Sequence, residues 1–320
     1  MRDALYSPVE GFYRRELPSG HFRTSVHAGT GMAQAVASLA SHVAAALPDH
    51  PFTLLDIGAG GGELLASLAT DAPEHWRLIG CELRPRPDGL PERVEWVASP
   101  PAQMQGLIVA NEWLDNVPVA VAERTDGEWR EVWVDESGVE SVGPAVSPAD
   151  ERWLSEWWPD AEEADRVEVG ASRDEAWVEL VAILESGVAL AVDYAVEPGR
   201  HRRGTLTGYR AGRQVQPVPD GSCDITAHVR FESVAAAGVR AGMETTAQLS
   251  QRDALAALGV SGRRPDLGLA SSDPSEYLRR LAQASQVAEL SNVDGLGAFT
   301  WLLQARGLEL PASVVTAARS

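Results

Sequence analysis

The sequence predicts an α/β fold in which a doubly wound, Rossmann-like sheet carries an N-terminal lid and an inserted subdomain of a hairpin and helices. Three observations indicate this class. Short apolar strands alternate with helical segments along the chain, the first of these strands stops at a run of glycines, and a long acidic interruption separates the fourth strand from the fifth. Strands that alternate with helices in one direction are typical of parallel sheets covered by helices.

The first elements follow from their apolar patterns. Residues 32–46 are rich in alanine and place Met32, Val36, Leu39 and Val43 on one face, which predicts a helix. Residues 52–57 form a continuous apolar run, as a buried parallel strand does, and residues 63–70 then predict a helix. We expect the later strands of the sheet at 76–82, 94–97, 107–110 and 188–193.

The interruption covers residues 119–185. Two strand-like segments flank Asp126 and Gly127, a pair that favours a tight hairpin turn. The segment 150–168 has eight acidic residues against two arginines, with tryptophans at helical spacing. We expect a solvated helix with one packed aromatic face there, and the alternative is a surface that attracts cationic partners. Helical patterns return from Ser250 to the end of the chain.

Charge and composition narrow the classes of function. The 320 residues include 27 basic and 46 acidic ones, which gives a formal net charge of −19. A chain this acidic is repelled by phosphate backbones, so we expect no nucleic-acid partner. Cys81 and Cys223 cannot form a disulfide framework, and no spacing of Cys and His indicates a metal site. No signal peptide or membrane-length apolar run is visible, so we expect a cytoplasmic protein without a membrane partner.

The strongest local signal is the segment from Leu55 to Glu63, which ends a predicted strand and opens a predicted helix. Its glycines let the backbone turn tightly and let a ligand approach without meeting a Cβ atom. Glu82 lies 20 residues beyond Gly62, at the end of the next predicted strand. A carboxylate at this place can accept hydrogen bonds from both hydroxyls of a ribose.

Two classes of cofactor compete for this pattern. A dinucleotide fingerprint needs a glycine at position 63, which is Glu63, and a pyrophosphate would lie beside that carboxylate and Asp56. S-adenosylmethionine (SAM) has no phosphate and carries a sulfonium and an ammonium, which acidic neighbours favour. Asp56, Gly58, Gly60 and Gly62 also meet the E/D-x-G-x-G-x-G pattern of class I methyltransferases. We predict SAM as the cofactor, with a dinucleotide enzyme or a structural glycine turn as alternatives.

Further blocks of sequence extend the match along nearly the whole chain. In order they are Gly11-Phe12-Tyr13, Phe22-Arg23-Thr24-Ser25, Asn111-Glu112-Trp113-Leu114-Asp115-Asn116-Val117-Pro118, Asp193-Tyr194, Gly204-Thr205-Leu206-Thr207-Gly208-Tyr209 and Asp224-Ile225-Thr226-Ala227-His228-Val229. Together with the glycine segment they resemble the MidA family of SAM-dependent methyltransferases. The mitochondrial members of that family methylate an arginine of a respiratory complex I subunit during assembly. The resemblance implies a class I methyltransferase sheet and a protein arginine as methyl acceptor.

The chain departs from the family pattern at three places. Val26 stands where the family has the proline of T-S-P, Ala195 replaces the glycine of D-Y-G, and residues 219–223 replace the Pro-Gly before D-I-T. With the resemblance, we divide the chain into four regions. These are an N-terminal lid and helix at 1–48, an SAM-binding core at 49–118, an insertion at 119–185, and the rest of the core with a C-terminal helical region at 186–320.

Four polar residues are candidates for catalysis. In class I folds the end of the fourth strand faces the transferring methyl group, where Asn111, Glu112 and Asp115 project. Because a protonated guanidinium has no free lone pair, two carboxylates would orient it and accept its proton. Glu112 and Asp115 share a face if their segment is helical; the alternatives are that Asp115 caps a helix and Glu112 only orients the cofactor. Asp193 is a further acid, or pairs with an arginine within 200–203.

The remaining candidates are assigned to binding. Trp113 lines a substrate channel or packs in the core. Asp224 and His228 are four residues apart, share one side if their segment is helical, and are candidates for contact with the substrate. Thr24 and Ser25 are candidates for contact with the cofactor from the N-terminal lid.

We therefore expect an SAM-dependent methyltransferase that methylates arginine of a protein substrate. A methyltransferase for a peptide or a small metabolite is the first alternative. A non-catalytic assembly protein that holds a partner is the second. The four acids Asp56, Glu82, Glu112 and Asp115 are all present, which argues against the last of these. The oligomeric state is not indicated by the sequence.

Overall fold

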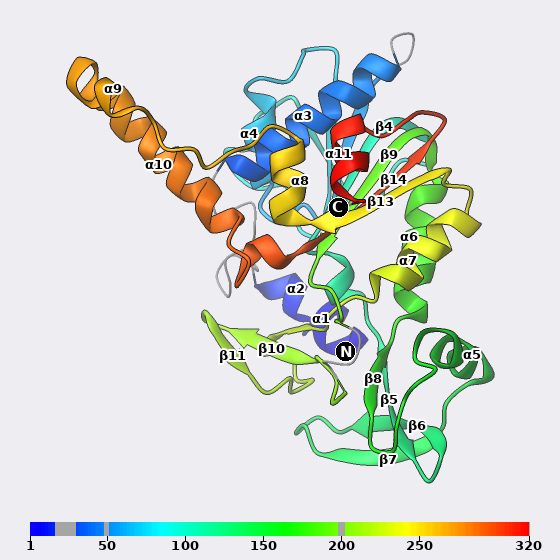
Figure 1. The fold of residues 1–320 in the computed structure, drawn as a ribbon. Helices are drawn as coiled ribbons and strands as arrows, with labels where there is room; N and C mark the ends of the chain where they lie inside the picture. The colour runs from blue at the N-terminus through cyan, green and yellow to red at the C-terminus, as the bar shows by residue number, and fades with distance from the viewer. Residues whose placement is uncertain (17–29, 48–50, 198–201, 320) are drawn as a thin grey trace. The chain divides into compact units, whose positions relative to one another are not determined.

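The computed structural model describes residues 1–16, 30–47, 51–197 and 202–319 of the chain. The chain forms two compact units, each assembled from separate stretches of sequence (Figure 1). Unit 1 consists of Met1–Phe22, Glu112–Ala182 and Asp193–Gly242. Unit 2 consists of Arg23–Asn111, Ile183–Val192 and Met243–Ser320.

Unit 2 is built on a mainly parallel seven-stranded sheet. Its strands are β1 (Thr53–Ile57), β2 (Arg77–Cys81), β3 (Val94–Val97), β4 (Met104–Asn111), β9 (Leu184–Asp193), β13 (Thr245–Ser250) and β14 (Thr300–Arg306). Their order across the sheet is β13-β14-β9-β4-β1-β2-β3. β1 lies between β2 and β4, is parallel to both, and is buried along its whole length. The predicted Rossmann-like α/β sheet is therefore confirmed.

Two glycines let β4 and β9 lie close together near the first residues of both strands. A Cβ atom at Gly187 of β9 would overlap the carbonyl oxygen of Gly106, and one at Gly106 would overlap that of Thr53 in β1. Both glycines have positive φ angles, +134° and +141°. Side chains other than hydrogen would therefore separate the three central strands.

The helices of unit 2 agree with the apolar patterns of the sequence. They are α3 (Gly31–Ala46), α4 (Glu63–Ala69), α8 (Gln251–Ala257), α9 (Leu267–Ser272), α10 (Pro274–Leu290), α11 (Ala312–Ala317) and a 3₁₀ turn (Leu296–Ala298). The predicted apolar face of α3 is buried: Met32, Val36, Leu39 and Val43 all lie in the core. This face packs on α4, α8, α10 and β4. In the part of the chain that the structure describes, no helix has the length and apolarity needed to span a bilayer.

The helical patterns from Ser250 onward correspond to α8, α9, α10 and α11, but the region also contains a strand, β14, that the sequence did not indicate. This strand holds Trp301, Leu302 and Leu303, which are all fully buried, and it pairs antiparallel with β13. A short apolar run that is buried on both faces lacks the alternation that identifies a strand, so its pattern does not distinguish it from a helix.

Unit 1 combines helices with two small antiparallel sheets. Its helices are α1 (Arg2–Tyr6), α2 (Phe12–Arg15), α5 (Pro148–Trp157), α6 (Ala171–Ala182) and α7 (Phe231–Arg240), with a 3₁₀ turn at Leu114–Asn116. The four-stranded sheet has the order β7-β6-β5-β8, from β5 (Ala120–Thr125), β6 (Glu128–Val134), β7 (Glu140–Ala145) and β8 (Arg166–Val169). The three-stranded sheet has the order β11-β10-β12, from β10 (Thr207–Arg210), β11 (Arg213–Val215) and β12 (Asp224–Thr226).

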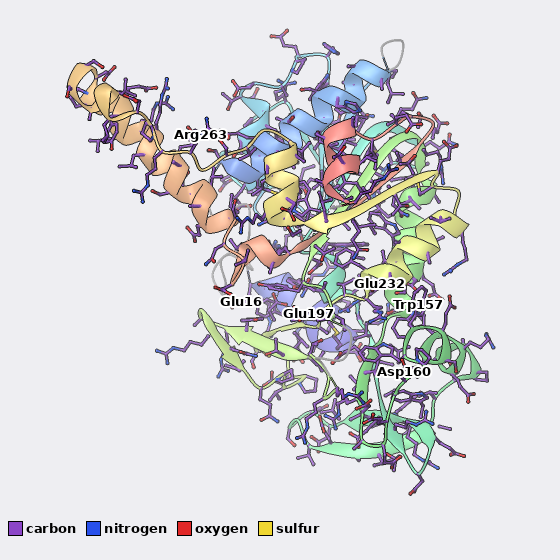
Figure 2. All side chains as sticks on the ribbon, in the orientation of Figure 1. Glu16, Trp157, Asp160, Glu197, Glu232 and Arg263 are labelled. Carbon is purple, nitrogen blue, oxygen red and sulfur yellow. The ribbon has the colours of Figure 1, made fainter. Side chains whose placement is uncertain are left out.

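The insertion contains the predicted hairpin, with Asp126 and Gly127 between β5 and β6. The expected acidic helix is shorter than predicted. α5 begins after Ser147, whose side chain caps it, and ends at Trp157, while Asp160 lies in the turn beyond (Figure 2). The second half of the acidic segment forms β8 instead, because alternating Val167 and Val169 join Trp153 in the core of this sheet.

Candidate active site

The glycine segment forms a tight loop in unit 2 between β1 and α4. Gly58, Gly60 and Gly62 have φ angles of +67°, +58° and +79°, in the left-handed region that favours glycine. A Cβ atom at Gly62 would also lie 2.8 Å from the Leu90 side chain. The glycines are therefore required by the backbone conformation, as the sequence predicted.

Glu82 follows β2 and lies against this loop. Its Oε2 accepts a hydrogen bond from the Gly60 backbone N–H at 3.0 Å, and its Oε1 accepts one from Leu83 at 2.8 Å. The Arg84 guanidinium pairs with the same carboxylate at 3.3 Å, and both side chains are largely buried. The structure thus brings together the predicted ribose-binding acid and the glycine loop.

Three carboxyl groups surround the loop. Asp56, near the end of β1, is buried, and Glu63, the first residue of α4, accepts a hydrogen bond from the Gly61 N–H at 3.0 Å. Burial raises the pKa of Asp56 to about 8, and repulsion from Glu63 and Glu82 adds to that shift. The negative charge of Glu63 and Glu82 opposes a ligand with phosphates at the loop and favours one with positive charge.

This donor set fits SAM. The loop can be approached closely because it lacks Cβ atoms at its glycines, and the Glu82 carboxylate is in place to accept ribose hydroxyls. The acids around it suit the sulfonium and the ammonium of that cofactor. Thr24 and Ser25, which the sequence also assigned to the cofactor, lie outside the described residues.

A second group of acids, which we call the acid cluster, lies in unit 1. It consists of Asp115, Asp193 and Asp224, whose exposed fractions are 2%, 0% and 0%. Asp193 Oδ2 accepts a hydrogen bond from the Asp115 backbone N–H at 3.0 Å, and its Oδ1 accepts one from Tyr194 at 2.9 Å. The structure therefore joins two predicted catalytic acids through a hydrogen bond from the backbone of Asp115 to the carboxyl group of Asp193.

Asp224 is held by two donors that the sequence did not identify. Its Oδ1 accepts from the Tyr13 hydroxyl at 2.6 Å and from Asn116 Nδ2 at 3.1 Å. Tyr13 belongs to α2, whose Phe12 packs with Ile225 of β12 in one hydrophobic cluster. Because Tyr13 and Asp224 are 211 residues apart in the chain, only the tertiary structure reveals this pair.

Arg173 is the buried cation beside these acids, with an exposed fraction of 1%. Its guanidinium donates to the carbonyl oxygens of His228 at 2.6 Å, Asp115 at 2.8 Å and Ala227 at 2.9 Å. Sequence reasoning did not single out this residue. The available signal was an arginine on the apolar side of α6, among residues such as Trp177 that the helix buries.

Burial and mutual repulsion change the protonation of the acid cluster. Burial raises the pKa of Asp115 well above its ordinary value, with further increases from Asp193, Asp224 and Glu112 and an opposing effect of Arg173. Burial also raises the pKa of Asp193 to about 6, although backbone N–H donors and Arg173 oppose the shift. Asp115 Oδ1 is buried and accepts no hydrogen bond from the described residues. This oxygen is available to a donor from a ligand.

The segment from Glu112 to Asp115 is not an α-helix, so the condition under which these two acids would share a face is not met. Glu112 has a φ angle of +50°, which is in the left-handed region, and only Leu114–Asn116 form a single 3₁₀ turn. Such a conformation costs a non-glycine residue about 1 kcal/mol or more. Glu112 directly follows Asn111, the last residue of β4, and Trp113 beside it is half-buried.

The segment of Asp224 and His228 is not helical either, so the condition under which they would share one side is not met. Asp224 lies in β12, and His228 follows in a loop. The His228 ring stacks on Tyr194, with ring centroids 5.6 Å apart, and its Nδ1 lies 3.1 Å from the Ala195 carbonyl oxygen. Residues Asp224–Thr226 adopt a strand conformation because they pair with β10 in the three-stranded sheet.

The alternative was an ion pair between Asp193 and an arginine within 200–203, and neither Arg202 nor Arg203, the two of these that the structure describes, pairs with it. Arg202 pairs with Asp165 and Glu162, each at 3.0 Å. Arg200 lies outside the described residues. Asp193 is instead an internal acceptor for backbone N–H groups.

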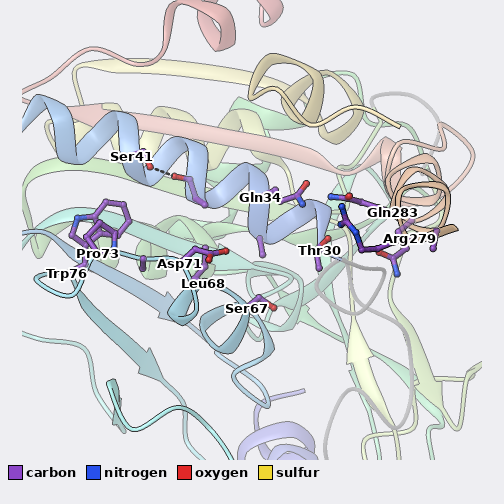
Figure 3. A pocket seen from close by; sticks show the side chains of 15 residues that line it. Thr30, Gln34, Ser41, Ser67, Leu68, Asp71, Pro73, Trp76, Arg279 and Gln283 are labelled. Atoms are coloured by element: carbon purple, nitrogen blue, oxygen red, sulfur yellow. Dashed lines mark hydrogen bonds between the residues drawn. The ribbon is translucent and has the colours of Figure 1, made fainter. Parts of the chain in front are cut away.

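A separate cavity in unit 2 has a volume of about 540 Å³ (Figure 3). It lies between α3, the end of α4 and α10, and its lining includes Gln34, Asp71, Trp76, Arg279 and Gln283. The glycine loop and Glu82 are not part of this lining. The cavity is thus distinct from the cofactor loop.

The sheet order and the glycine loop with its acids define a class I methyltransferase, an enzyme that transfers a methyl group from SAM. A family model described as "Putative S-adenosyl-L-methionine-dependent methyltransferase" matches residues 67–248. The chain belongs to this family, since the match covers more than half of its length.

Two solved structures from Burkholderia thailandensis are similar to this chain. One contains S-adenosylhomocysteine (SAH) and is 26% identical to this chain, with a TM-score of 0.81. Its alignment covers 98% of this chain and 88% of that chain. The other, a native structure, is 26% identical with a TM-score of 0.79, and the alignment covers 98% and 87%. A comparison with curated proteins finds none that matches. SAM as the cofactor, predicted from the sequence, is confirmed by these findings.

Proposed function

We propose that the enzyme methylates an arginine side chain of a protein substrate, and that the acid cluster binds this side chain. The observation that carries the proposal is Asp115 Oδ1, a buried carboxyl oxygen without a hydrogen-bond donor among the described residues. A buried oxygen of this kind is costly unless a ligand supplies the donor. A guanidinium supplies several donors in a planar arrangement that matches carboxylates.

The charges of unit 1 support the same choice of acceptor. The cluster contains three buried acids, and Arg173, the buried cation beside them, donates its hydrogen bonds to backbone carbonyls. A cationic acceptor would reduce the repulsion among the acids, whereas a neutral one would not. The net charge of −19 would also attract a basic segment of a protein.

Each candidate residue has a role in this proposal. When bound, SAM supplies a methyl group on a sulfonium. Asp115 and Glu112 orient the guanidinium, and Asp193, with its pKa raised to about 6, accepts the proton that the nitrogen loses. Asn111, at the end of β4, positions the reacting groups. The substrate beyond the reacting guanidinium is contacted by Trp113, Asp224 and His228.

The glycine loop and Glu82 hold the cofactor in the proposal. Gly58, Gly60 and Gly62 admit it at close range, Glu82 accepts its ribose hydroxyls, and Asp56, whose pKa is raised to about 8, gains its negative charge when the cationic cofactor binds. Membership of the MidA family and a cytoplasmic location belong to the same proposal. They are supported by the ordered sequence blocks and by the residue composition.

The test is transfer of a labelled methyl group from SAM to a protein extract, followed by mass spectrometry of the labelled peptides. We expect methylarginine, and we expect Asp115→Asn to lower turnover by about 10²–10⁴-fold. Asp160→Asn, an exposed aspartate of unit 1, is the matched control and should leave turnover unchanged. Calorimetry with SAH should give the same affinity for the wild type, Asp115→Asn and Asp160→Asn.

Other outcomes would support the alternatives. Label only in the small-molecule fraction would indicate a metabolite as acceptor. Normal SAH binding with no label in any fraction, together with a stable complex between the enzyme and a protein, would indicate a holding function. Methyllysine in place of methylarginine would retain a cationic acceptor and contradict the assignment of a guanidinium.

A further inference from the structure

Glu63 lies over the glycine loop in a defined position. Its Oε2 accepts the Gly61 N–H at 3.0 Å, and a Cβ atom at Gly61 would overlap the Glu63 carboxylate. The next N–H of the same loop, that of Gly60, is taken by Glu82 at 3.0 Å. Two neighbouring N–H groups of the loop are thus occupied by carboxylates of the protein itself.

This arrangement reverses the usual electrostatics of a glycine loop. Backbone N–H groups in such loops commonly bind the anionic part of a ligand. Here the two donors are occupied by Glu63 and Glu82, and buried Asp56 adds a third carboxyl group. Arg84 pairs with Glu82. The loop therefore offers a ligand negative charge in place of these two N–H donors.

SAM and its product differ mainly in charge. SAM carries a carboxylate, an ammonium and a sulfonium, which sum to +1, whereas SAH has lost the sulfonium charge and is neutral overall. A site with several carboxylates discriminates between these two ligands through long-range attraction, even if it makes the same hydrogen bonds with both.

We propose that Glu63 is a specificity-determining residue of the cofactor site, whose carboxylate, with those of Asp56 and Glu82, favours the sulfonium-bearing cofactor over its neutral product. The enzyme thereby releases SAH more readily than SAM. This inference concerns the cofactor and does not depend on which acceptor is methylated.

The protonation of Asp56 couples this selectivity to pH. Asp56 faces Glu63 at the start of α4 and Glu82 after β2, with Cys81 of β2 and Arg84 nearby. Because its pKa is raised to about 8, Asp56 is mostly protonated at neutral pH when the site is empty. A bound cation favours the carboxylate, so binding of SAM releases a proton, and SAM affinity increases as pH rises toward 8. SAH should show a weaker dependence.

Glu63→Gln tests the proposal, because the glutamine amide oxygen can still accept from the Gly61 N–H while the charge is removed. Calorimetry should show that the Kd for SAM rises about 3- to 10-fold, as expected for loss of one nearby charge that is partly screened, while the Kd for SAH changes less. Glu74→Gln, which removes the charge of an exposed glutamate in the same unit, should leave both affinities unchanged.

A second readout separates charge from changes in loop shape. The enthalpy of SAM binding should depend on the ionisation enthalpy of the buffer in the wild type, which reports proton release, and less so in Glu63→Gln. Glu63→Asp, which keeps the charge, should preserve the preference for SAM. Equal changes in the affinities for SAM and SAH, or no change in either, would overturn the proposal. These measurements need no acceptor, so their failure leaves the proposed arginine methylation intact.

Discussion

Arg173 and Asp115 are both buried in unit 1, and the guanidinium donates to the backbone carbonyl of Asp115 at 2.8 Å. The Asp115 carboxyl oxygen Oδ1 accepts no hydrogen bond from the described residues. The arginine therefore fixes the backbone of the acid without taking its carboxyl group. A binding site for a cation can combine burial with an available acceptor in this way.

Replacement of Asp115 by Asn should raise stability at neutral pH. The pKa of this carboxyl is raised by burial, so the folded state resists the ionisation that the unfolded chain undergoes freely. An amide has the same shape and no charge. We expect a higher midpoint of urea unfolding for Asp115→Asn than for the wild type at pH 8, and a smaller difference at pH 4. A lower midpoint at pH 8 would show that the ionised carboxylate stabilises the fold.

Arg173→Met should destabilise unit 1 strongly. It leaves the carbonyl oxygens of Asp115, Ala227 and His228 without their donor and removes the buried cation beside the acids. The loss of one member of a buried charged group typically costs about 3–5 kcal/mol. Urea unfolding measures this effect, with Arg152→Met on the exposed side of α5 as the control. Equal stability of the two variants would contradict this role of Arg173.

Tyr13→Phe removes the 2.6 Å hydrogen bond to Asp224 and little else. Removal of one partner of a buried hydrogen bond costs about 1–3 kcal/mol, and we expect a loss of this size in the free energy of unfolding. In the variant that also carries Asp224→Asn, the additional effect of Tyr13→Phe should be smaller. Tyr277→Phe on α10 serves as the control for loss of a hydroxyl. Additive effects would show that the two side chains are not coupled.

The stability of the fold should decrease as pH rises from about pH 5 to pH 8. Burial raises the pKa of Asp174 and of Asp193 to about 6 and that of Asp56 to about 8. A raised pKa of a carboxyl group contributes stability at pH values below its unfolded pKa, and this contribution is lost as pH rises through the folded pKa. The urea midpoint should therefore decrease from pH 5 to pH 8. Asp56→Asn should flatten the upper part of this decrease, and a flat wild-type profile would rule the mechanism out.

Glu112→Gly should leave stability unchanged or raise it, while methyl transfer falls. Glycine adopts the observed φ angle of +50° without the steric cost that Glu112 bears. Thermal unfolding and turnover with labelled SAM distinguish the two effects. A destabilised variant would mean that the Glu112 side chain supports the fold, and unchanged turnover would remove it from the catalytic residues.

The parts of the cofactor loop that the sequence predicted depend on local pattern. Gly58, Gly60 and Gly62 lie between an apolar strand and a helix, and Glu82 follows the next strand, so the connection of parallel strands brings the acid to the loop. The position of Glu82 beside the glycine loop can be predicted from the sequence because it depends only on elements that are neighbours along the chain.

The acid cluster could be predicted only in part. Asp115 follows β4 and Asp193 ends the adjacent parallel strand β9, as the sequence indicated. The φ angle of Glu112, which excludes a helix, is not visible in a pattern of residue types. Arg173 and Tyr13 reach the cluster from α6 and α2, and their contacts depend on the packing of distant segments. A hydrophobic environment around an arginine or a tyrosine does not reveal its partner.

The place of β14 within the sheet affects how the protein can fold during synthesis. β14 lies between β9 and β13, so β13 has no hydrogen-bonding neighbour in the sheet until residues 300–306 have left the ribosome. Until then the nascent sheet ends at β9, whose edge is exposed although this strand consists largely of buried apolar residues. Unit 2 is thus assembled late and from sequence-distant pieces, and a chaperone that shields the β9 edge would act in the interval before translation reaches β14.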